Sequence, residues 1–138
     1  MDLAYLVTPF VAWLCAGSLK FLINSIKSRQ AAFGLIGYGG LPSNHSAIVS
    51  SMAALIALRE GVSHPAFGVA VALAFIVILD AHSLRRHIGR QAEILNRLNS
   101  EVTNDERLRE RLGHSRIEIA AGIVVGITVA LVVQWVSV

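Results

Sequence analysis

The sequence predicts an all-α integral membrane protein, a helical bundle of about four transmembrane helices with an amphipathic segment at the cytoplasmic face. Three observations lead to this fold class: the composition, the spacing of the apolar stretches and the distribution of basic residues. Hydrophobic residues make up 54% of the 138 residues and the mean hydropathy is +0.62. Only 15% of the residues are charged, whereas soluble domains carry about 25%. The length corresponds to one domain, residues 1–138, and the single cysteine, Cys15, excludes an intrachain disulfide.

Four apolar stretches are the expected membrane spans. A helix needs about 20 apolar residues to cross about 30 Å of hydrocarbon, so the second stretch is short for a span. A compact turn containing Gly61 and Pro65 joins the second and third stretches, which predicts a tight helical hairpin. The expected spans are residues 3 to about 23, about 46 to 58, 66 to about 84, and 117 to 138.

A charged, leucine-punctuated segment, residues 85–111, separates the third and fourth spans. Its apolar residues recur at mostly helical spacing, which predicts an amphipathic helix or helix pair on the membrane surface, with a break at Asn104 and Asp105. In the fourth span, Gly122 and Gly126 form a GxxxG arrangement that favours close helix contact. We expect this glycine face to be available to a second copy of the chain, and therefore a homo-oligomer, most simply a dimer.

Basic residues are distributed very unevenly between the connections. Eleven of the twelve lysines and arginines lie in or beside the first and third connections, and Arg59 alone lies in the second. Cytoplasmic connections carry the excess of lysine and arginine, so we expect the first and third connections in the cytoplasm, both termini outside, and location in the plasma (inner) membrane. The net charge of +3 fits this topology better than a nucleic-acid partner, and none is expected.

The first connection ends in a glycine-led loop, residues 39–46, that runs into the second span. Pro42 suits the approach to a helix, and either Ser43 or Asn44 can serve as its N-cap. The free amides and positive dipole end of such a helix attract phosphate, and His45 would place a proton donor beside that anion. The alternative is a capped helix whose histidine merely packs or faces water.

A second glycine-led loop, residues 112–118, enters the fourth span and is expected on the same face. His114 and Glu118 stand four residues apart, so the carboxylate can hold one ring nitrogen and leave the other basic and directed at a substrate. Ser115 and Glu118 also have the spacing of a capping box, in which the glutamate serves only the helix terminus. The residues alone leave both interpretations open.

These residues resemble the divergent membrane branch of the type 2 phosphatidic acid phosphatase superfamily, which is related to acid phosphatases and vanadium-dependent haloperoxidases. The resemblance spans nearly the whole chain and rests on residues 39–47, 80–96 and 112–126. The run from Pro42 to His45 is similar to the superfamily's Pro-Ser-Gly-His motif, with Asn44 in the glycine place. His114 and Glu118 are similar to the last motif, in which a histidine is followed four positions later by aspartate.

The resemblance implies a two-step phosphoryl transfer without a metal ion or other cofactor. It implies that His114 attacks phosphorus, that Glu118 orients the His114 ring, and that His45 protonates the leaving oxygen. The sequence departs from the superfamily in two further places, since Lys20 and Lys27 have the first motif's spacing without its Arg-Pro, and Leu108 stands where an arginine is expected. The candidate substrate-binding residues are Lys20, Lys27, Ser43, Asn44, Asp80, Arg85, Arg86 and Arg90.

The leading hypothesis is a metal-independent phosphatase of a lipid phosphate or lipid diphosphate, with membrane lipids as its surroundings. A small membrane transporter using Asp80, His45 and His114 as intramembrane titratable groups is a second hypothesis, and a non-catalytic anion-binding scaffold is a third. Asp80 can instead simply pair with Arg85 or Arg86. A metal site at Asp80 with the neighbouring histidines His82 and His87 is conceivable, but no familiar ligand spacing supports it.

Overall fold

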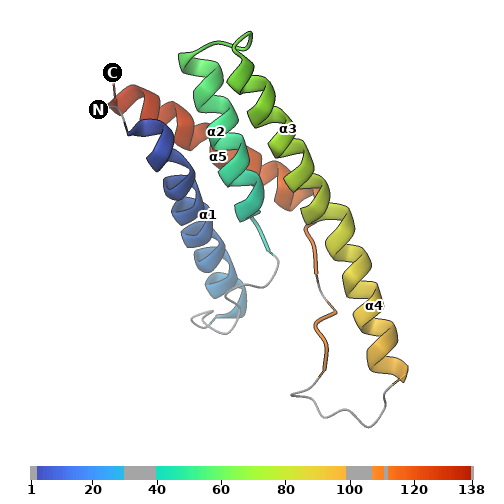
Figure 1. Ribbon diagram of the computed structural model, residues 1–138. Helices are drawn as coiled ribbons and strands as arrows, with labels where there is room; N and C mark the ends of the chain where they lie inside the picture. The colour runs from blue at the N-terminus through green and yellow to red at the C-terminus, as the bar shows by residue number, and fades with distance from the viewer. Residues whose placement is uncertain (1–2, 30–39, 99–106, 111, 138) are drawn as a thin grey trace.

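The computed structural model describes residues 3–29, 40–98, 107–110 and 112–137, and every regular element among them is helical. The five α-helices are α1 (Ala4–Ser28), α2 (Asn44–Arg59), α3 (Pro65–Leu79), α4 (Arg85–Leu98) and α5 (Arg116–Val136), with a π-helical turn at Asp80–Leu84. Helices α1, α2, α3 and α5 form a bundle, and the two ends of the chain lie together at one end of it (Figure 1). The all-α membrane fold class is therefore confirmed.

All four expected spans are helices, although their lengths differ from the prediction. Within the described part of the chain, three continuous helical stretches are long and apolar enough to cross a membrane: Ala4–Lys27, Pro65–Leu98 and Arg116–Val136. Helix α2 has 16 residues, which is about 24 Å at 1.5 Å per residue, and it is shorter than the hydrocarbon core as expected. Helix α1 continues past the predicted end near residue 23, because the polar residues that follow are compatible with a helix. The helix ends at Ser28, and the next residue, Arg29, has a positive φ of 53°.

The charged segment after Asp80 does not begin a separate helix. Helix α4 is amphipathic as expected, but it continues α3 through the π-helical turn as one long rod (Figure 1). Of the two expected alternatives, a helix or a helix pair, the described residues show a single helix, because residues 107–110 have no helical structure and lie against α4. Asn96 holds this segment with two hydrogen bonds, donating to the Leu108 carbonyl at 2.8 Å and accepting from the Leu108 amide at 3.0 Å. The predicted break at residues 104 and 105 lies outside the described residues.

The glycine face of α5 packs against α2 within the same chain. A Cβ atom on Gly122 would clash with the Ser43 carbonyl oxygen, and one on Gly126 would clash with Ser50 Oγ. Only glycine allows this approach, which brings the first turn of α2 onto the first turns of α5. The expectation that this face is available to a second copy is therefore wrong, and the dimer stays a prediction without this support.

Small residues also bring α1 close to the other two helices. Ala12 and Ala16 are fully buried and pack against Ala47 of α2 and Val129 of α5. Since three helices converge here, the start of α2 is held between α1 and α5 at the end of the bundle opposite the chain termini. Both histidine loops meet at this end.

Candidate active site

The first histidine loop is fixed by the N-cap of α2. Ser43 is the cap, because its hydroxyl accepts a hydrogen bond from the Ser46 amide at 3.3 Å and another from the Ser46 hydroxyl at 3.0 Å. Its own amide donates to the Glu118 carbonyl at 2.9 Å, which ties the loop to α5. Ser43 is fully buried, so this candidate substrate-binding hydroxyl serves the helix terminus and the docking of the loop.

The second histidine loop is held by the π-helical turn. The His114 amide donates to the Ala81 carbonyl at 2.9 Å, and His82 Nδ1 lies 3.0 Å from the His114 carbonyl. A carbonyl can only accept, so Nδ1 of His82 carries a proton and donates. Gly113 has a φ of 89°, and a Cβ there would lie 2.8 Å from Arg86 Cγ, so glycine is required at this bend. π-helical turns are frequent at functional sites, and this one holds both the amide and the carbonyl of His114.

Glu118 serves both purposes that the sequence left open. Its Oε2 atom lies 3.0 Å from His114 Nδ1 and also accepts from the Ser115 amide at 3.0 Å. The Ser115 hydroxyl accepts from the Glu118 amide at 3.3 Å, which completes a capping box. The carboxylate fixes the tautomer of the buried His114 ring with hydrogen on Nδ1, so Nε2 keeps its lone pair.

His45 lies beside His114 in a different environment. The centroids of the two rings are 5.9 Å apart. His45 Nε2 lies 3.4 Å from Arg85 Nη2, and a guanidinium can only donate, so in the neutral ring the proton is on Nδ1. That Nδ1 is buried and has no hydrogen-bond partner among the described residues. Asp80 accepts from Arg85 Nε at 3.1 Å and so holds the arginine beside this histidine.

Charges from four different elements act on the two rings. Burial lowers the pKa of His45 below its usual value, the charges of Arg85, His114 and Lys20 lower it further, and the charge of Asp80 opposes these shifts. Burial also lowers the pKa of His114, the hydrogen bond to Glu118 opposes this shift, and Lys20 and Arg85 add to it. Both rings are therefore neutral at neutral pH, which suits His114 as a nucleophile. A bound phosphate would counter the nearby cations and raise the pKa of His45.

The structure brings some candidate residues together and leaves others apart. Asn44 lies at the start of α2 beside Gly17, and its buried Oδ1 has no hydrogen-bond partner among the described residues. Lys27 is exposed and lies about 10 Å further along α1 than Lys20, as two helical turns require. Arg90 is exposed on α4. The electrostatic neighbours of the two rings, called the histidine cluster below, are Lys20, His45, Asp80, Arg85, His114 and Glu118.

A polar hollow of about 440 Å³ borders His114. Arg86 lines it, so this candidate is near the cluster without being part of it. The sequence patterns did not single out Arg116 or the contact role of His82, although the position of Arg116 two residues after His114 was a usable signal. Among the described side chains, no group of three His, Cys, Asp or Glu residues is placed to hold a metal ion. The hollow is lined by His82, Arg86, Leu112, Gly113, His114, Ser115 and Arg116.

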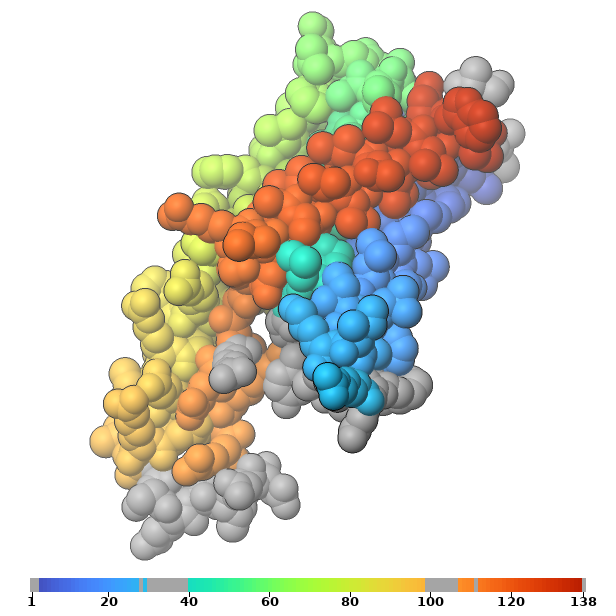
Figure 2. Space-filling model, turned by 180° about the vertical axis from the view of Figure 1, so that it is seen from behind, coloured from blue at the N-terminus to red at the C-terminus, as the bar shows by residue number. Residues whose placement is uncertain are grey.

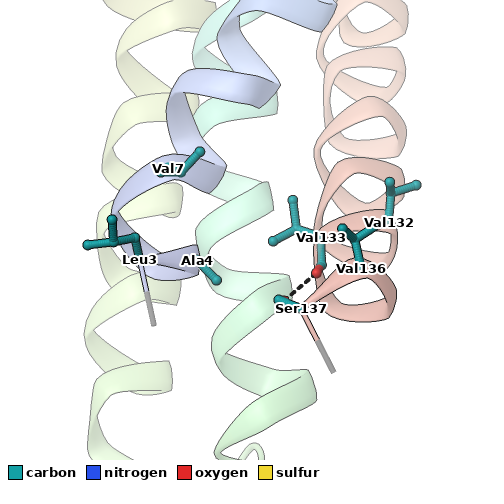
Figure 3. Close-up of a pocket in the computed structure, with 7 residues that line it drawn as sticks. All are labelled: Leu3, Ala4, Val7, Val132, Val133, Val136 and Ser137. Carbon is teal, nitrogen blue, oxygen red and sulfur yellow. Dashed lines mark hydrogen bonds between the residues drawn. The ribbon is translucent and has the colours of Figure 1, made fainter. Parts of the chain in front are cut away.

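A larger hollow of about 690 Å³ lies at the opposite end of the bundle, between the start of α1 and the end of α5 (Figure 3). The described residues that line it are apolar except Ser137, whose hydroxyl donates to the Val133 carbonyl. None of these lining residues is titratable, so this cavity is not a site of acid–base chemistry despite its size. They are Leu3, Ala4, Val7, Val132, Val133, Val136 and Ser137.

Comparison with known proteins identifies a family and a relative of similar length. The model of a family described as the divergent PAP2 family matches residues 1–129. The chain is also similar to an uncharacterized membrane protein, YuiD, of Bacillus subtilis (strain 168), with 32% identity over 147 residues that cover 94% of this chain and 93% of that protein. No solved structure matches the chain. Because the family match covers both histidine loops and all five helices except the last residues of α5, this integral membrane protein belongs to the divergent PAP2 family.

Proposed function

We propose that this protein is a membrane phosphatase that hydrolyses a lipid phosphate or lipid diphosphate without a metal ion, through a phosphohistidine formed on His114. The observation that carries the proposal is the hydrogen bond between His114 Nδ1 and Glu118 Oε2, which leaves Nε2 basic beside a second histidine and two cations. A buried nucleophile, a carboxylate that orients it and a separate acid are the parts that covalent phosphoryl transfer needs. Membership of a phosphatase-related family supports the same reaction class.

In the first step, Nε2 of His114 forms a bond to phosphorus while the bond from phosphorus to the leaving oxygen breaks. The substrate binds together with a proton held by His45, and this proton goes to the leaving oxygen. Glu118 stabilises the positive charge that develops on the His114 ring. Lys20 and Arg85 balance the charge on the phosphate oxygens, a task for which cations held in a half-buried site are effective.

In the second step, water attacks phosphorus and the phosphorus–nitrogen bond breaks. His45, neutral after the first step, takes a proton from this water and then loses it with the departing phosphate, so both histidines return to their starting state. In this proposal Asn44 assists, because its buried Oδ1, which lacks a partner among the described residues, can accept a hydrogen bond from a protonated phosphate oxygen or from water.

The test is to measure phosphate release from a panel of lipid monophosphates and diphosphates in detergent, and to trap the phosphoenzyme by rapid denaturation at alkaline pH. The expected result is turnover of at least one lipid phosphate, inhibition by vanadate, and the phosphoryl label on His114 by mass spectrometry. His87, which is exposed on α4, provides a control, and His87→Ala is expected to retain the label on His114. A label on another residue contradicts the assignment, and absence of both turnover and vanadate binding contradicts the phosphatase.

We also propose that the histidine cluster faces the cytoplasm, because both connections that meet there are rich in basic residues. In a Cys15→Ser background, Arg29→Cys and Arg97→Cys are expected to react with a membrane-impermeant thiol reagent only from the cytoplasmic side, and Ser63→Cys only from outside. Labelling of the first two variants from outside contradicts this orientation and leaves the chemistry untouched.

A further inference from the structure

The polar hollow beside His114, called the arginine hollow below, carries two arginines that no described carboxylate neutralises. Arg86 comes from α4 and Arg116 from the first turn of α5, and none of the residues that line the hollow is acidic. Neither guanidinium has a hydrogen bond or ion pair with a described residue. Asp80 and Glu118, the carboxylates of the histidine cluster, are each engaged in another ion pair. Within the described part of the chain, the hollow therefore has a positive charge that suits an anion.

The loop before α5 is shaped to receive the side chain of Arg86. A Cβ on Gly113 would lie 2.8 Å from Arg86 Cγ, so the stem of the arginine lies against the loop backbone. His82 Nδ1 donates to the His114 carbonyl and fixes the same loop to the π-helical turn. Figure 2 shows orange residues that lead into α5 beside yellow residues of the α3–α4 rod, and these two parts of the chain form the walls of the hollow. An arginine whose stem is already packed loses less freedom when its head binds a ligand.

His114 borders both the histidine cluster and the arginine hollow. Its ring centroid lies 5.9 Å from that of His45, and the same residue lines the hollow. Arg85 and Arg86 are adjacent in the chain and serve different places, since Arg85 Nη2 lies 3.4 Å from His45 Nε2 whereas Arg86 lines the hollow. An anion in the hollow therefore lies next to the residue that the proposed mechanism phosphorylates.

We propose that the arginine hollow is a second phosphate-binding site, separate from the position in which His114 attacks phosphorus. Guanidinium groups bind phosphate oxygens through paired hydrogen bonds, and two of them from different helices suit a group with several equivalent oxygens. At about 30 Å³ for each water-sized group, 440 Å³ holds roughly fifteen such groups, so a phosphate group fits. Arg86 and Arg116 are exposed, so phosphate reaches the hollow from solvent. The proposal deepens the function proposed above and rests on it for the role of His114.

The phosphate group in this site has two possible sources. One source is a lipid diphosphate, in which Nε2 of His114 bonds to the terminal phosphorus while the bond from this phosphorus to the bridging oxygen breaks. The proton from His45 goes to the bridging oxygen, the inner phosphate departs with the lipid, and the hollow holds this inner phosphate. The other source is free phosphate, the product of the second step. Because both sources present the same chemistry to the arginines, kinetics must distinguish them.

The first test measures phosphate binding without turnover. Labelled inorganic phosphate is equilibrated by dialysis with the full-length protein in nanodiscs of a zwitterionic lipid. The matched control for Arg86→Gln/Arg116→Gln is Arg97→Gln/Arg107→Gln, which removes the same charge from exposed arginines that do not line the hollow.

Two phosphates are expected to bind to the wild-type protein and to the control, one at the histidine cluster and one in the arginine hollow. In Arg86→Gln/Arg116→Gln the second phosphate is expected to bind at least about tenfold more weakly, because charge-assisted hydrogen bonds are lost. Equal binding by the two double variants overturns the proposal. If the double variant is unstable, Arg116→Gln alone is measured, since this exposed side chain has no partner among the described residues, and unchanged binding there also overturns the proposal.

The second test measures hydrolysis and separates the two sources. If the source is a lipid diphosphate, the ratio of kcat/KM for a lipid diphosphate to that for the matching monophosphate is expected to fall at least about tenfold in Arg86→Gln/Arg116→Gln. If the source is free phosphate, this ratio stays at its wild-type value and the noncompetitive component of inhibition by phosphate disappears. A variant in which neither the ratio nor the inhibition differs from the control contradicts the second site.

The two tests also separate this proposal from the phosphatase itself. If phosphate binding depends on Arg86 and Arg116 while no lipid phosphate is hydrolysed, the arginine hollow stands and the phosphatase fails. Hydrolysis through a phosphoryl label on His114, together with equal phosphate binding by the two double variants, has the opposite meaning, since the phosphatase then stands and the second site fails.

Discussion

The two histidine loops are built alike and differ in what each histidine contacts. Each loop turns at a glycine with positive φ, Gly40 or Gly113, and continues into a serine-capped helix. In the second loop a carboxylate holds His114, whereas in the first loop a guanidinium approaches His45. An anionic partner makes a ring more basic and a cationic partner makes it a weaker base, so similar backbones carry rings with different chemistry.

This difference, more than loop geometry, supports the proposed roles of His114 as nucleophile and His45 as general acid. His114 has a fixed tautomer and a free Nε2 lone pair, which are the properties of a nucleophile. His45 has Nε2 directed at Arg85 and an Nδ1 without a partner among the described residues, and it gains a proton only when an anion offsets its cationic neighbours. The following predictions test this contrast, beginning with the largest expected effect.

Replacement of His114 by alanine is expected to reduce kcat/KM by at least about 10³-fold for every phosphate ester, because the proposed mechanism forms the covalent intermediate on this ring. The backbone amide that donates to Ala81 remains, so the loop should keep its position. Steady-state kinetics with p-nitrophenyl phosphate and a lipid phosphate measures the loss. Turnover of His114→Ala near the wild-type rate would remove the distinction between the loops.

Replacement of Glu118 by glutamine is expected to cause a loss of kcat smaller than that of His114→Ala and larger than that of His45→Ala on p-nitrophenyl phosphate. An amide oxygen can still orient the His114 ring, but it cannot stabilise the charge that develops there. The matched control is Ser115→Ala, which breaks the capping bond to the Glu118 amide and leaves the contact to His114. That control is expected to lose about 1 kcal/mol of stability and little activity. Equal activity losses in both variants would mean that Glu118 serves only the helix terminus.

Replacement of His45 by alanine is expected to act according to the leaving group. An alkyl phosphate needs a proton on its leaving oxygen, so its kcat/KM should fall about 10²- to 10⁴-fold, whereas p-nitrophenyl phosphate should lose far less. The dependence of log kcat/KM on leaving-group pKa, measured across a series of aryl and alkyl phosphates, should become steeper in the variant. A slope unchanged from wild type contradicts the role of His45 as general acid.

Much of this site follows from local sequence patterns. The caps at Ser43 and Ser115, the spacing of His114 and Glu118, and the apolar spans depend on residues a few positions apart, so the sequence alone predicts them. The clustering of basic residues also predicts that the two loops share one face, and the 5.9 Å between the centroids of the histidine rings agrees with this.

The remaining features depend on contacts that no local pattern specifies. A GxxxG arrangement predicts a close helix partner without saying which, and the partner is α2 rather than a second copy. The choice among Arg85, Arg86 and Arg90 depends on the π-helical turn, because each extra residue rotates the following side chains by about 100° around the axis. The change to charged residues at position 85 suggests the start of a separate segment, although those residues favour helix as strongly as the ones before them.

The smallest expected effect is a fractional proton taken up when an anion binds. In the free protein the pKa of His45 is lowered, first by burial and then by Arg85, His114 and Lys20, so the ring is neutral at pH 7. A dianion beside the ring raises this pKa, and between the free and bound pKa values binding carries a proton with it. The affinity for the anion should therefore fall as pH rises through the bound pKa, and the uptake should vanish below the free pKa, where the proton is already present.

Sulfate is a suitable probe because it is fully ionised at neutral pH, and calorimetry in two buffers of different ionisation enthalpy gives the uptake directly. We expect between zero and one proton in the wild-type protein and in His87→Ala, and none in His45→Ala. Proton uptake that persists in His45→Ala would mean that another group, such as His114, takes up the proton. The proposed difference in basicity between the two histidines would then be wrong.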